Sequence, residues 1–268
     1  MKNLLVVSVL LVIASACQSS KSASTTNKMP LMPEIMRGEI SRTLYSFDRK
    51  DSVDSKLNYA FYSNPKYDWQ DTVNASIGYF LWSTSQFEGD SYVYSDLTHR
   101  FFGGILDRFE QLYTVDLNDS SYFGVWNYDA SISIDTTLQN YTQVAMNAYF
   151  YTGGAHPNSA LRQLVVSEET NEIMSWKSIV KNEEKFHQLA EKYFRKAMGL
   201  RATESLKDLY WFENGIFRCN ENFSISPNGM TFIFNAYEVA PYAVGVIEFT
   251  IPMHELKKEL TIDLRFSK

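Results

Sequence analysis

Two stretches of the chain have the apolar spacing that is typical of amphipathic helices. The first, Asp96–Tyr113, carries a broad face of aromatic and aliphatic residues. The second, Glu183–Leu200, has apolar residues at positions i, i+3, i+4, i+7, i+8 and i+11 counted from Phe186. Gly199 marks its end, because glycine readily adopts the left-handed conformation that closes a helix. These two stretches are the main predicted helices.

Two further stretches are less regular. The range Trp69–Leu81 fits both helical spacing and strand alternation. A helix is favoured there, because helical spacing gathers the larger side chains on one stripe. A short helix is also expected near the C-terminus, at His254–Leu260.

Alternating apolar and polar residues predict several strands, which are connected by turns containing glycine, proline or asparagine. Ser226-Pro227-Asn228-Gly229 has the composition of a hairpin turn. The strands are expected at Leu57–Phe61, Tyr122–Ile134, Thr142–Tyr151, Ser159–Val166, Phe223–Ile225, Met230–Phe234 and Val246–Ile251. Strands outnumber helices and pair through short turns, which predicts an α+β fold with a mostly antiparallel sheet and two main helices packed on it. A parallel α/β sheet would need regular alternation of strands and helices, which the pattern lacks.

The N-terminal residues have the pattern of an export signal. Residues 1–16 contain a short basic start and a ten-residue apolar stretch, too short to span a bilayer. Ala14-Ser15-Ala16-Cys17 looks like a bacterial lipobox, so we expect Cys17 to be lipidated and residues 17–33 to form a flexible tether. The predicted location is extracytoplasmic, lipid-anchored, in the periplasm or on the outer membrane. A plain signal peptide is the alternative.

The formal net charge of −6 excludes some classes of partner. An acidic chain with no basic cluster is a poor candidate for nucleic-acid binding. Anionic lipid would repel it, so membrane association would depend on the acyl chains alone. If Cys17 is lipidated, Cys219 is the only other cysteine, and it is interpreted as a partly buried structural residue rather than a reactive thiol.

The segment Tyr149–Asn158, YFYTGGAHPN, is the most site-like part of the sequence. Gly153 and Gly154 permit a sharp turn between two predicted strands, and Pro157 stiffens the backbone beside His156. The candidate ligand-binding residues in this segment are Tyr149, Tyr151, Gly153, Gly154, His156 and Asn158. Three roles remain open for His156: fixing the turn, contacting a binding partner, or acting as a general base.

A second segment, Phe234–Gly245, reads FNAYEVAPYAVG and is followed by Ile247–Pro252, IEFTIP. The remaining candidate ligand-binding residues are Tyr237, Glu238 and Tyr242. The two tyrosines flank a proline in a predicted loop, where they can stack on sugar rings or anchor a protein partner. Glu238 is the first carboxylate to consider as a partner for His156.

Together the two segments resemble the signatures YxYTGGAH and FNPYEIAPYAxG…EVTIP of a bacterial extracytoplasmic domain family of unknown function, with Ala236 where proline is usual. Members include the ectodomain of the lysozyme-sensing anti-sigma factor RsiV and the non-catalytic part of the peptidoglycan deacetylase PdaC. The resemblance implies a PdaC-like part at residues 34–143 and an RsiV-like part at residues 144–268, forming one compact unit. We expect both segments to lie near each other there.

The resemblance implies a non-catalytic cell-envelope protein that recognises a lysozyme-like protein or a peptidoglycan glycan. The family's deacetylase activity belongs to a separate domain with a TFDDGP-like metal motif, which this sequence lacks. His254-Glu255 begins like a zinc-protease helix, but Lys258 replaces the second histidine. We therefore expect no cofactor and no metal. The alternative is an envelope hydrolase that uses His156.

Overall fold

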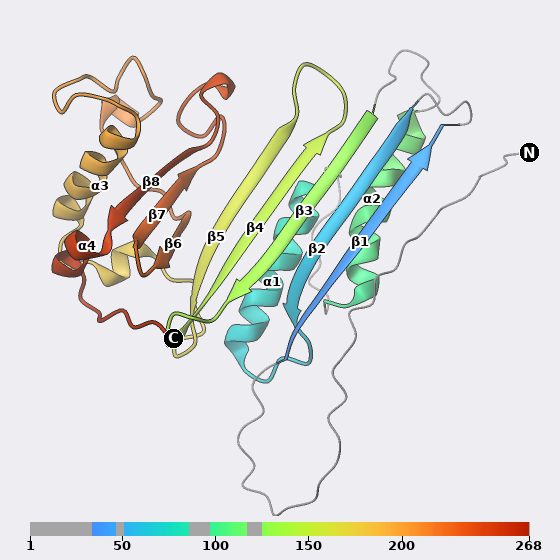
Figure 1. Cartoon of the computed structure of the whole chain (residues 1–268), viewed down its shortest axis with the longest axis horizontal. Helices are drawn as coiled ribbons and strands as arrows, with labels where there is room; N and C mark the ends of the chain where they lie inside the picture. The colour runs from blue at the N-terminus through green and yellow to red at the C-terminus, as the bar shows by residue number, and fades with distance from the viewer. Residues whose placement is uncertain (1–33, 47–50, 86–96, 117–124, 268) are drawn as a thin grey trace, which may run out of the picture. The chain divides into compact units, whose positions relative to one another are not determined.

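The structure is a computed structural model that describes residues 34–46, 51–85, 97–116 and 125–267 (Figure 1). The expected signal peptide, Cys17 and the tether lie outside these residues. The chain divides into two compact units. The first contains the described residues up to Ile132 together with Ala148–Asn158, and the second contains Ser133–Asn147 and the residues from Ser159 onward. The sequence-based boundary after residue 143 falls inside a strand, Tyr141–Tyr151, that contributes to both units.

The predicted α+β class with mostly antiparallel sheets is confirmed. One sheet has the strand order β1-β2-β3-β4-β5 and the other has the order β6-β7-β8. The strands are β1 (Ile35–Tyr45), β2 (Ser52–Tyr62), β3 (Val125–Asp135), β4 (Tyr141–Tyr151), β5 (Asn158–Ser167), β6 (Phe223–Ser226), β7 (Gly229–Phe234) and β8 (Ile247–Pro252). The β1–β2, β6–β7 and β7–β8 pairs are antiparallel, whereas β2 and β3 are parallel.

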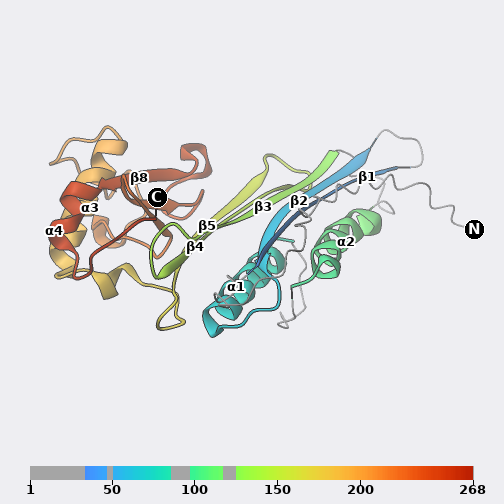
Figure 2. The same cartoon turned by 60° about the horizontal axis from the view of Figure 1, so that its bottom comes forward.

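The predicted helices are present, with adjusted ends. The α-helices are α1 (Asp68–Thr84), α2 (His99–Asp116), α3 (Glu183–Ala197) and α4 (Met253–Glu259), and short 3-10 helices occur at Trp176–Ile179, Glu213–Gly215 and Tyr242–Val244. The ambiguous range around Trp69–Leu81 is helical. In the first unit, α1 and α2 cover the same face of the sheet (Figure 2). None of the helices among the described residues is long and apolar enough to cross a membrane.

Strand β1 was not predicted, and two of its residues explain why. Gly38 and Arg42 occupy positions where an alternating strand would carry apolar side chains. A Cβ atom on Gly38 would lie only 2.4 Å from the Tyr59 hydroxyl oxygen, so the tyrosine ring needs glycine beneath it. Arg42 forms ion pairs with Asp107 and Glu110 of α2.

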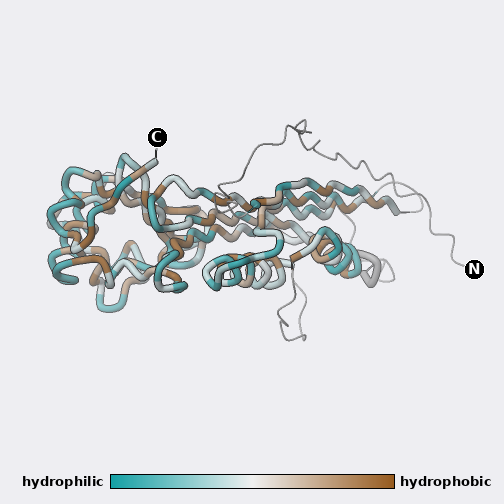
Figure 3. The backbone as a smooth tube through the Cα atoms, turned by 90° about the horizontal axis from the view of Figure 1, so that it is seen from below, coloured by the Kyte–Doolittle hydropathy of each residue, from teal (hydrophilic) through white to brown (hydrophobic). Residues whose placement is uncertain are grey.

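The core of the first unit is built from aromatic rings of β2, α2 and β3. Tyr59 stacks on Phe102, with ring centroids 4.0 Å apart. Phe109 packs against Tyr128 of β3 in a tilted arrangement, with ring centroids 5.2 Å apart. Alternating hydrophobic and hydrophilic positions follow the strands, as the period-two pattern predicted (Figure 3).

The core of the second unit is centred on Phe194 of α3, which is fully buried. Its ring contacts five other aromatic rings, with centroids between 5.0 and 6.3 Å away. These rings belong to Tyr210, Phe212, Phe217, Phe234 and Phe249. Each fully buried phenylalanine contributes about 1.5–3 kcal/mol of transfer free energy, so this cluster ties α3, β7, β8 and the chain between α3 and β6 together.

Amide side chains join the two sheets within the second unit. The buried side chain of Gln143, in β4, accepts a hydrogen bond from the Ile225 N–H and donates one to the Ile225 carbonyl, both at 2.7 Å. A side-chain amide thus takes the place of a neighbouring strand for one residue of β6. Such pairing avoids leaving a buried backbone donor and acceptor unsatisfied.

Two asparagines pair in the same way with β5, the edge strand of the first sheet. Asn222 accepts a hydrogen bond from the Gln163 N–H at 2.7 Å and donates one to the Leu161 carbonyl at 2.9 Å. Asn235 accepts a bond from the Leu161 N–H at 2.7 Å and donates to the same carbonyl at 3.0 Å. The beginning of β6 and the end of β7 are therefore held against β5.

Candidate functional site

The turn between β4 and β5 has the backbone that its glycines predicted. Gly153 and Gly154 have φ angles of 90° and 91°, a region that residues with a Cβ atom rarely adopt. The Tyr151 hydroxyl donates a hydrogen bond to the Gly154 carbonyl at 3.0 Å, which closes the turn. Tyr149 is exposed on the strand that leads into it, and Asn158 is exposed where β5 begins.

His156 is engaged locally. Its Nδ1 atom lies 2.9 Å from the carbonyl oxygen of Pro157, so the ring nitrogen donates to the backbone. The side chain is half-buried. This contact agrees with the turn-fixing role among the three considered for His156, while contact with a binding partner stays a prediction.

The loop between β7 and β8 presents a pair of tyrosines. The Tyr237 and Tyr242 rings lie 5.5 Å apart between centroids. Tyr237 is 52% exposed and has a φ angle of 66°, which is rare for a residue with a large side chain. Tyr242 begins the 3-10 helix at Tyr242–Val244. A strained, exposed aromatic residue in a loop is a common feature of binding sites.

Glu238 holds this loop in place. Its two carboxylate oxygens accept hydrogen bonds from the Asn235 N–H at 2.8 Å and from the side chain of Asn220 at 2.7 Å. Burial lowers the pKa of the neighbouring Arg162 guanidinium, and the negative charges of Glu221 and Glu238 oppose that shift. Through its two hydrogen bonds, Glu238 supports the backbone of the loop between β7 and β8, residues 235–246, which is named the tyrosine loop.

The two groups of candidate residues belong to different units. Tyr149, Tyr151, Gly153, Gly154, His156 and Asn158 lie in the first unit, whereas Tyr237, Glu238 and Tyr242 lie in the second. Within each unit the candidates come together on one hairpin or one loop. The expectation that both groups share a single surface, and the pairing of His156 with Glu238, stay predictions.

Sequence reasoning missed a third segment, Leu206–Ile216. Leu209, Trp211 and Ile216 are 44%, 55% and 49% exposed, whereas Tyr210 and Phe212 point into the core and contact Phe194. The Trp211 N–H donates a hydrogen bond to the Val239 carbonyl at 2.8 Å, so this segment adjoins the tyrosine loop. In the sequence, the run Leu-Tyr-Trp-Phe at residues 209–212 could have indicated exposed apolar side chains. It contains more large apolar residues than one face of a short segment can bury.

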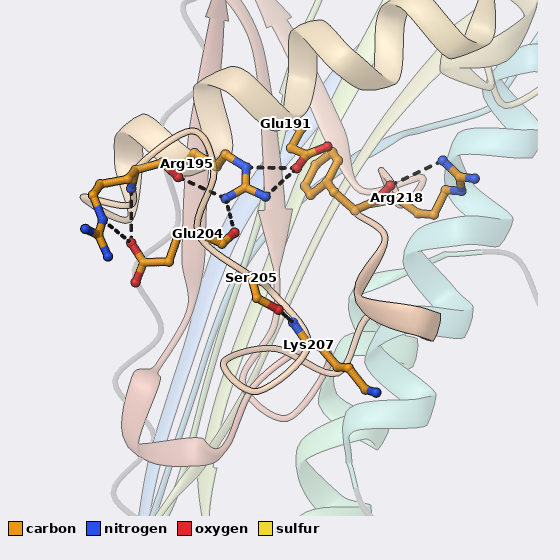
Figure 4. Close-up of polar contacts among 8 residues, drawn as sticks. Glu191, Arg195, Glu204, Ser205, Lys207 and Arg218 are labelled. Carbon is orange, nitrogen blue, oxygen red and sulfur yellow. Dashed lines mark hydrogen bonds and ion pairs between the residues drawn. The ribbon is translucent and has the colours of Figure 1, made fainter.

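Arg195 of α3 fixes the chain that leads into this segment (Figure 4). Its guanidinium donates to the carbonyl oxygens of Arg201 and Glu204, at 3.1 and 2.8 Å. It also forms an ion pair with Glu191 one helical turn earlier, at 2.7 Å. The arginine thus satisfies backbone carbonyls beyond the helix end.

The buried His187 lies beside Trp176 and near the partly buried Cys219, and this pair is unsuited to nucleophilic chemistry. His187 packs edge-on against the Trp176 ring, with centroids 4.9 Å apart, and its Nδ1 atom lies 3.5 Å from the Cys219 backbone nitrogen. Burial lowers the pKa of His187 and raises the pKa of the Cys219 thiol. A thiol with a raised pKa is a poor nucleophile. Among the described residues, no group of three or more histidine, cysteine or acidic side chains could hold a metal ion.

Comparison with known proteins finds one family model that matches part of the second unit. Residues 176–254 match the DUF3298 family model, described as a protein of unknown function. The DUF3298 match includes α3, the segment Leu206–Ile216 and the tyrosine loop, and it leaves the hairpin turn of His156 outside. No curated protein gives a significant match.

Two solved structures of DUF3298 family proteins share the fold. One, from Bacteroides fragilis, has a TM-score of 0.65 and 19% identity, and the match covers 86% of this chain and 94% of that chain. The other, from Pseudomonas aeruginosa PAO1, has a TM-score of 0.58 and 14% identity, and covers 88% and 98% of the two chains. At these identities the likeness concerns the fold alone.

Two glycine-to-alanine substitutions test the geometry of the hairpin turn. Gly154→Ala should lower the free energy of unfolding by about 1–2 kcal/mol, because alanine is strained at positive φ. Gly104→Ala, in α2, should instead raise it by up to about 1 kcal/mol, because alanine favours a helix interior. Cβ atoms at both positions would have open space. Urea unfolding measures both effects, and equal effects of the two substitutions would contradict the assigned turn.

Proposed function

We propose that the protein is a non-catalytic binding lipoprotein of the cell envelope, and that its second unit recognises a wall-active protein such as lysozyme. The observation that carries the proposal is a set of exposed apolar residues on two adjoining loops. This loop surface consists of Leu209, Trp211, Ile216, Tyr237, Val244 and Val246.

The loop surface has the composition of a protein-binding site. Exposed tryptophan and tyrosine are enriched among the residues that contribute most to binding free energy. Phe194 packs beneath both loops, Glu238 bonds the backbone of the tyrosine loop, and Arg195 bonds the chain before Leu206, so little conformational entropy would be lost on binding. A rigid base with exposed aromatic residues supports recognition of a partner rather than a structural role alone.

The charge of the loops favours a basic partner. Four acidic residues, Asp208, Glu213, Glu238 and Glu248, are exposed on or beside the loop surface, against two exposed basic residues, Lys207 and Arg218, and the partly buried Arg162. The whole chain carries a formal net charge of −6. Complementary charge accelerates the association of a basic protein such as lysozyme, and the effect weakens as salt rises. A peptidoglycan glycan, which would stack on the same tyrosines, remains the other ligand of this proposal.

The resemblance to RsiV-like domains also supports the proposal that the second unit is a binding module. The segment Phe234–Gly245 resembles the motif of RsiV-like domains, with Ala236 in place of proline, and it forms most of the tyrosine loop. Its Asn235 and Glu238 support the backbone, whereas Tyr237 is 52% exposed and packs against the Tyr242 ring. We propose that the chain is an RsiV-like and PdaC-like protein in this sense.

Binding should depend on the loop surface. Trp211→Ala should weaken lysozyme binding about tenfold to thirtyfold, because the exposed indole would be lost without disturbing the core. Tyr242→Ala should act in the same direction. Tyr79→Ala, at an equally exposed tyrosine of α1, is the matched control and should leave affinity unchanged. Calorimetry at two salt concentrations, against lysozyme and soluble peptidoglycan fragments, measures these effects.

Several outcomes would decide against the proposal. An absence of binding to both ligands would reject it, and so would equal effects of Trp211→Ala and Tyr79→Ala. The same preparations test the alternative of an envelope hydrolase. Turnover of a wall substrate that is lost in His156→Ala, with the fold retained, would favour catalysis over binding.

The proposed anchor has a separate test. Metabolic labelling with a palmitate analogue should label the protein, and Cys17→Ser should abolish the label, because the lipid would be attached at that residue. Cys219→Ser is the control and should leave labelling intact, since this thiol lies within the folded second unit. An unlabelled protein, or a label that persists in Cys17→Ser, would contradict the assignment.

A further inference from the structure

Strand β1 (Ile35–Tyr45) is an edge of the five-stranded sheet, and its outer side meets no other strand among the described residues (Figure 1). The opposite edge differs, because the side chains of Asn222 and Asn235 bond the backbone of β5 there. Helices α1 and α2 pack on one face of the sheet rather than along the edge of β1 (Figure 2). An uncovered edge strand can pair with a strand of another chain.

Alternate residues of β1 direct their backbone groups away from β2. At one end of the β1–β2 ladder, the Ser46 N–H donates to the Asp51 carbonyl at 3.0 Å. At the other end, the Ser63 N–H donates to the Glu34 carbonyl at 3.2 Å. Bonded and non-bonded pairs alternate along an antiparallel ladder, so the even-numbered residues of β1 bond β2. The outward N–H and C=O groups belong to the odd-numbered residues Ile35, Arg37, Glu39, Ser41, Thr43 and Tyr45.

Strand β1 lacks most of the features that protect an edge from pairing. It contains no proline and no lysine, and its register with β2 runs through 11 residues without a bulge. Its inward-pointing charge, Arg42, is compensated by Asp107 and Glu110. Large apolar side chains are exposed toward both ends, with Met36 at 41% and Tyr45 at 55%. The edge is therefore long, regular and partly apolar.

We infer that two copies of this chain associate through β1, as antiparallel neighbours related by a two-fold axis beside Ile40. In this register Tyr45 lies opposite Ile35 of the second copy, and Met36 lies opposite its Leu44. The exposed apolar side chains at both ends of the strand are thus covered by apolar partners. Odd-numbered residues face odd-numbered residues, so the outward N–H and C=O groups bond one another along the whole strand.

The charges of β1 are compatible with this symmetric pairing. Each charged residue faces an uncharged residue of the second copy, so no like charges meet. The pairs are Arg37 with Thr43, Glu39 with Ser41, and Arg42 with Gly38. A two-fold contact uses the same surface on both copies, so each pair occurs twice. This contact is independent of the proposed recognition of a wall-active protein, because it uses β1 and not the loop surface.

Substitutions of Ser41 test the pairing by charge. Ser41→Glu places a carboxylate opposite Glu39 of the second copy and should weaken the dimer about tenfold, whereas Ser41→Lys should strengthen it by a similar factor. Within one copy the charge effect is reversed, because residue 41 also lies opposite Lys56 of β2. A loss of stability therefore cannot explain the expected weakening by Ser41→Glu. Ser133→Glu, at an exposed serine of the inner strand β3, is the matched control and should leave the dimer unchanged.

Sedimentation equilibrium of the purified protein carrying Cys17→Ser, so that no acyl chain drives association, measures the dissociation constant. Hydrogen exchange then locates the contact. The outward N–H groups of β1 should exchange at least about tenfold more slowly in the dimer than in the dilute monomer, whereas the N–H groups bonded to β2 should change little.

The inference is overturned if the protein stays monomeric at about 100 μM, or if Ser41→Glu and Ser133→Glu have equal effects. Protection that appears elsewhere than in β1 would also overturn it. Trp211→Ala should leave the dimer intact, and loss of the dimer in this variant would assign the contact to the loop surface instead. Circular dichroism of each variant confirms that the fold is retained.

Discussion

The pairing of backbone groups by amide side chains is the constraint on which the second unit depends. Leu161 and Gln163 belong to β5, at the edge of the first sheet, where backbone N–H and C=O groups would otherwise lack partners. Asn222 and Asn235 satisfy them, and Gln143 does the same for Ile225. The bonds between Gln143 and Ile225 are buried, and leaving such a group unsatisfied costs about 1–3 kcal/mol, whereas the partly buried asparagine bonds contribute less each.

The same contacts determine where the exposed loops lie. Asn235 pairs with β5 through its side chain and with Glu238 through its backbone, so the tyrosine loop begins from a fixed point. The Trp211 N–H then joins the preceding segment to that loop at Val239. Buried aromatic contacts of Phe194 support both from the core side. An exposed aromatic surface is thereby held on a base that is itself rigid.

The sequence pattern predicted those elements that are determined by residues close together in the chain. The helix α3 follows from its apolar spacing, and the β6–β7 hairpin follows from Pro227-Asn228-Gly229. Strand β1 could not be predicted, because Arg42 pairs with α2 residues more than sixty positions away. The role of Asn235 was hidden for the same reason, since Leu161 is 74 residues distant. The sequence does not distinguish Trp211 from its aromatic neighbours, and only the fold shows that Tyr210 and Phe212 occupy the core while Trp211 is exposed.

Residue-resolved hydrogen exchange of the native protein tests the central role of the amide pairing most directly. The N–H groups of Leu161, Gln163 and Ile225 are the donors to Asn235, Asn222 and Gln143. If these pairings stabilise the second unit, the three amides should exchange as slowly as those of the β7–β8 ladder, within about tenfold, because they open only with the core. Exchange at the rate of exposed turn amides would contradict this account.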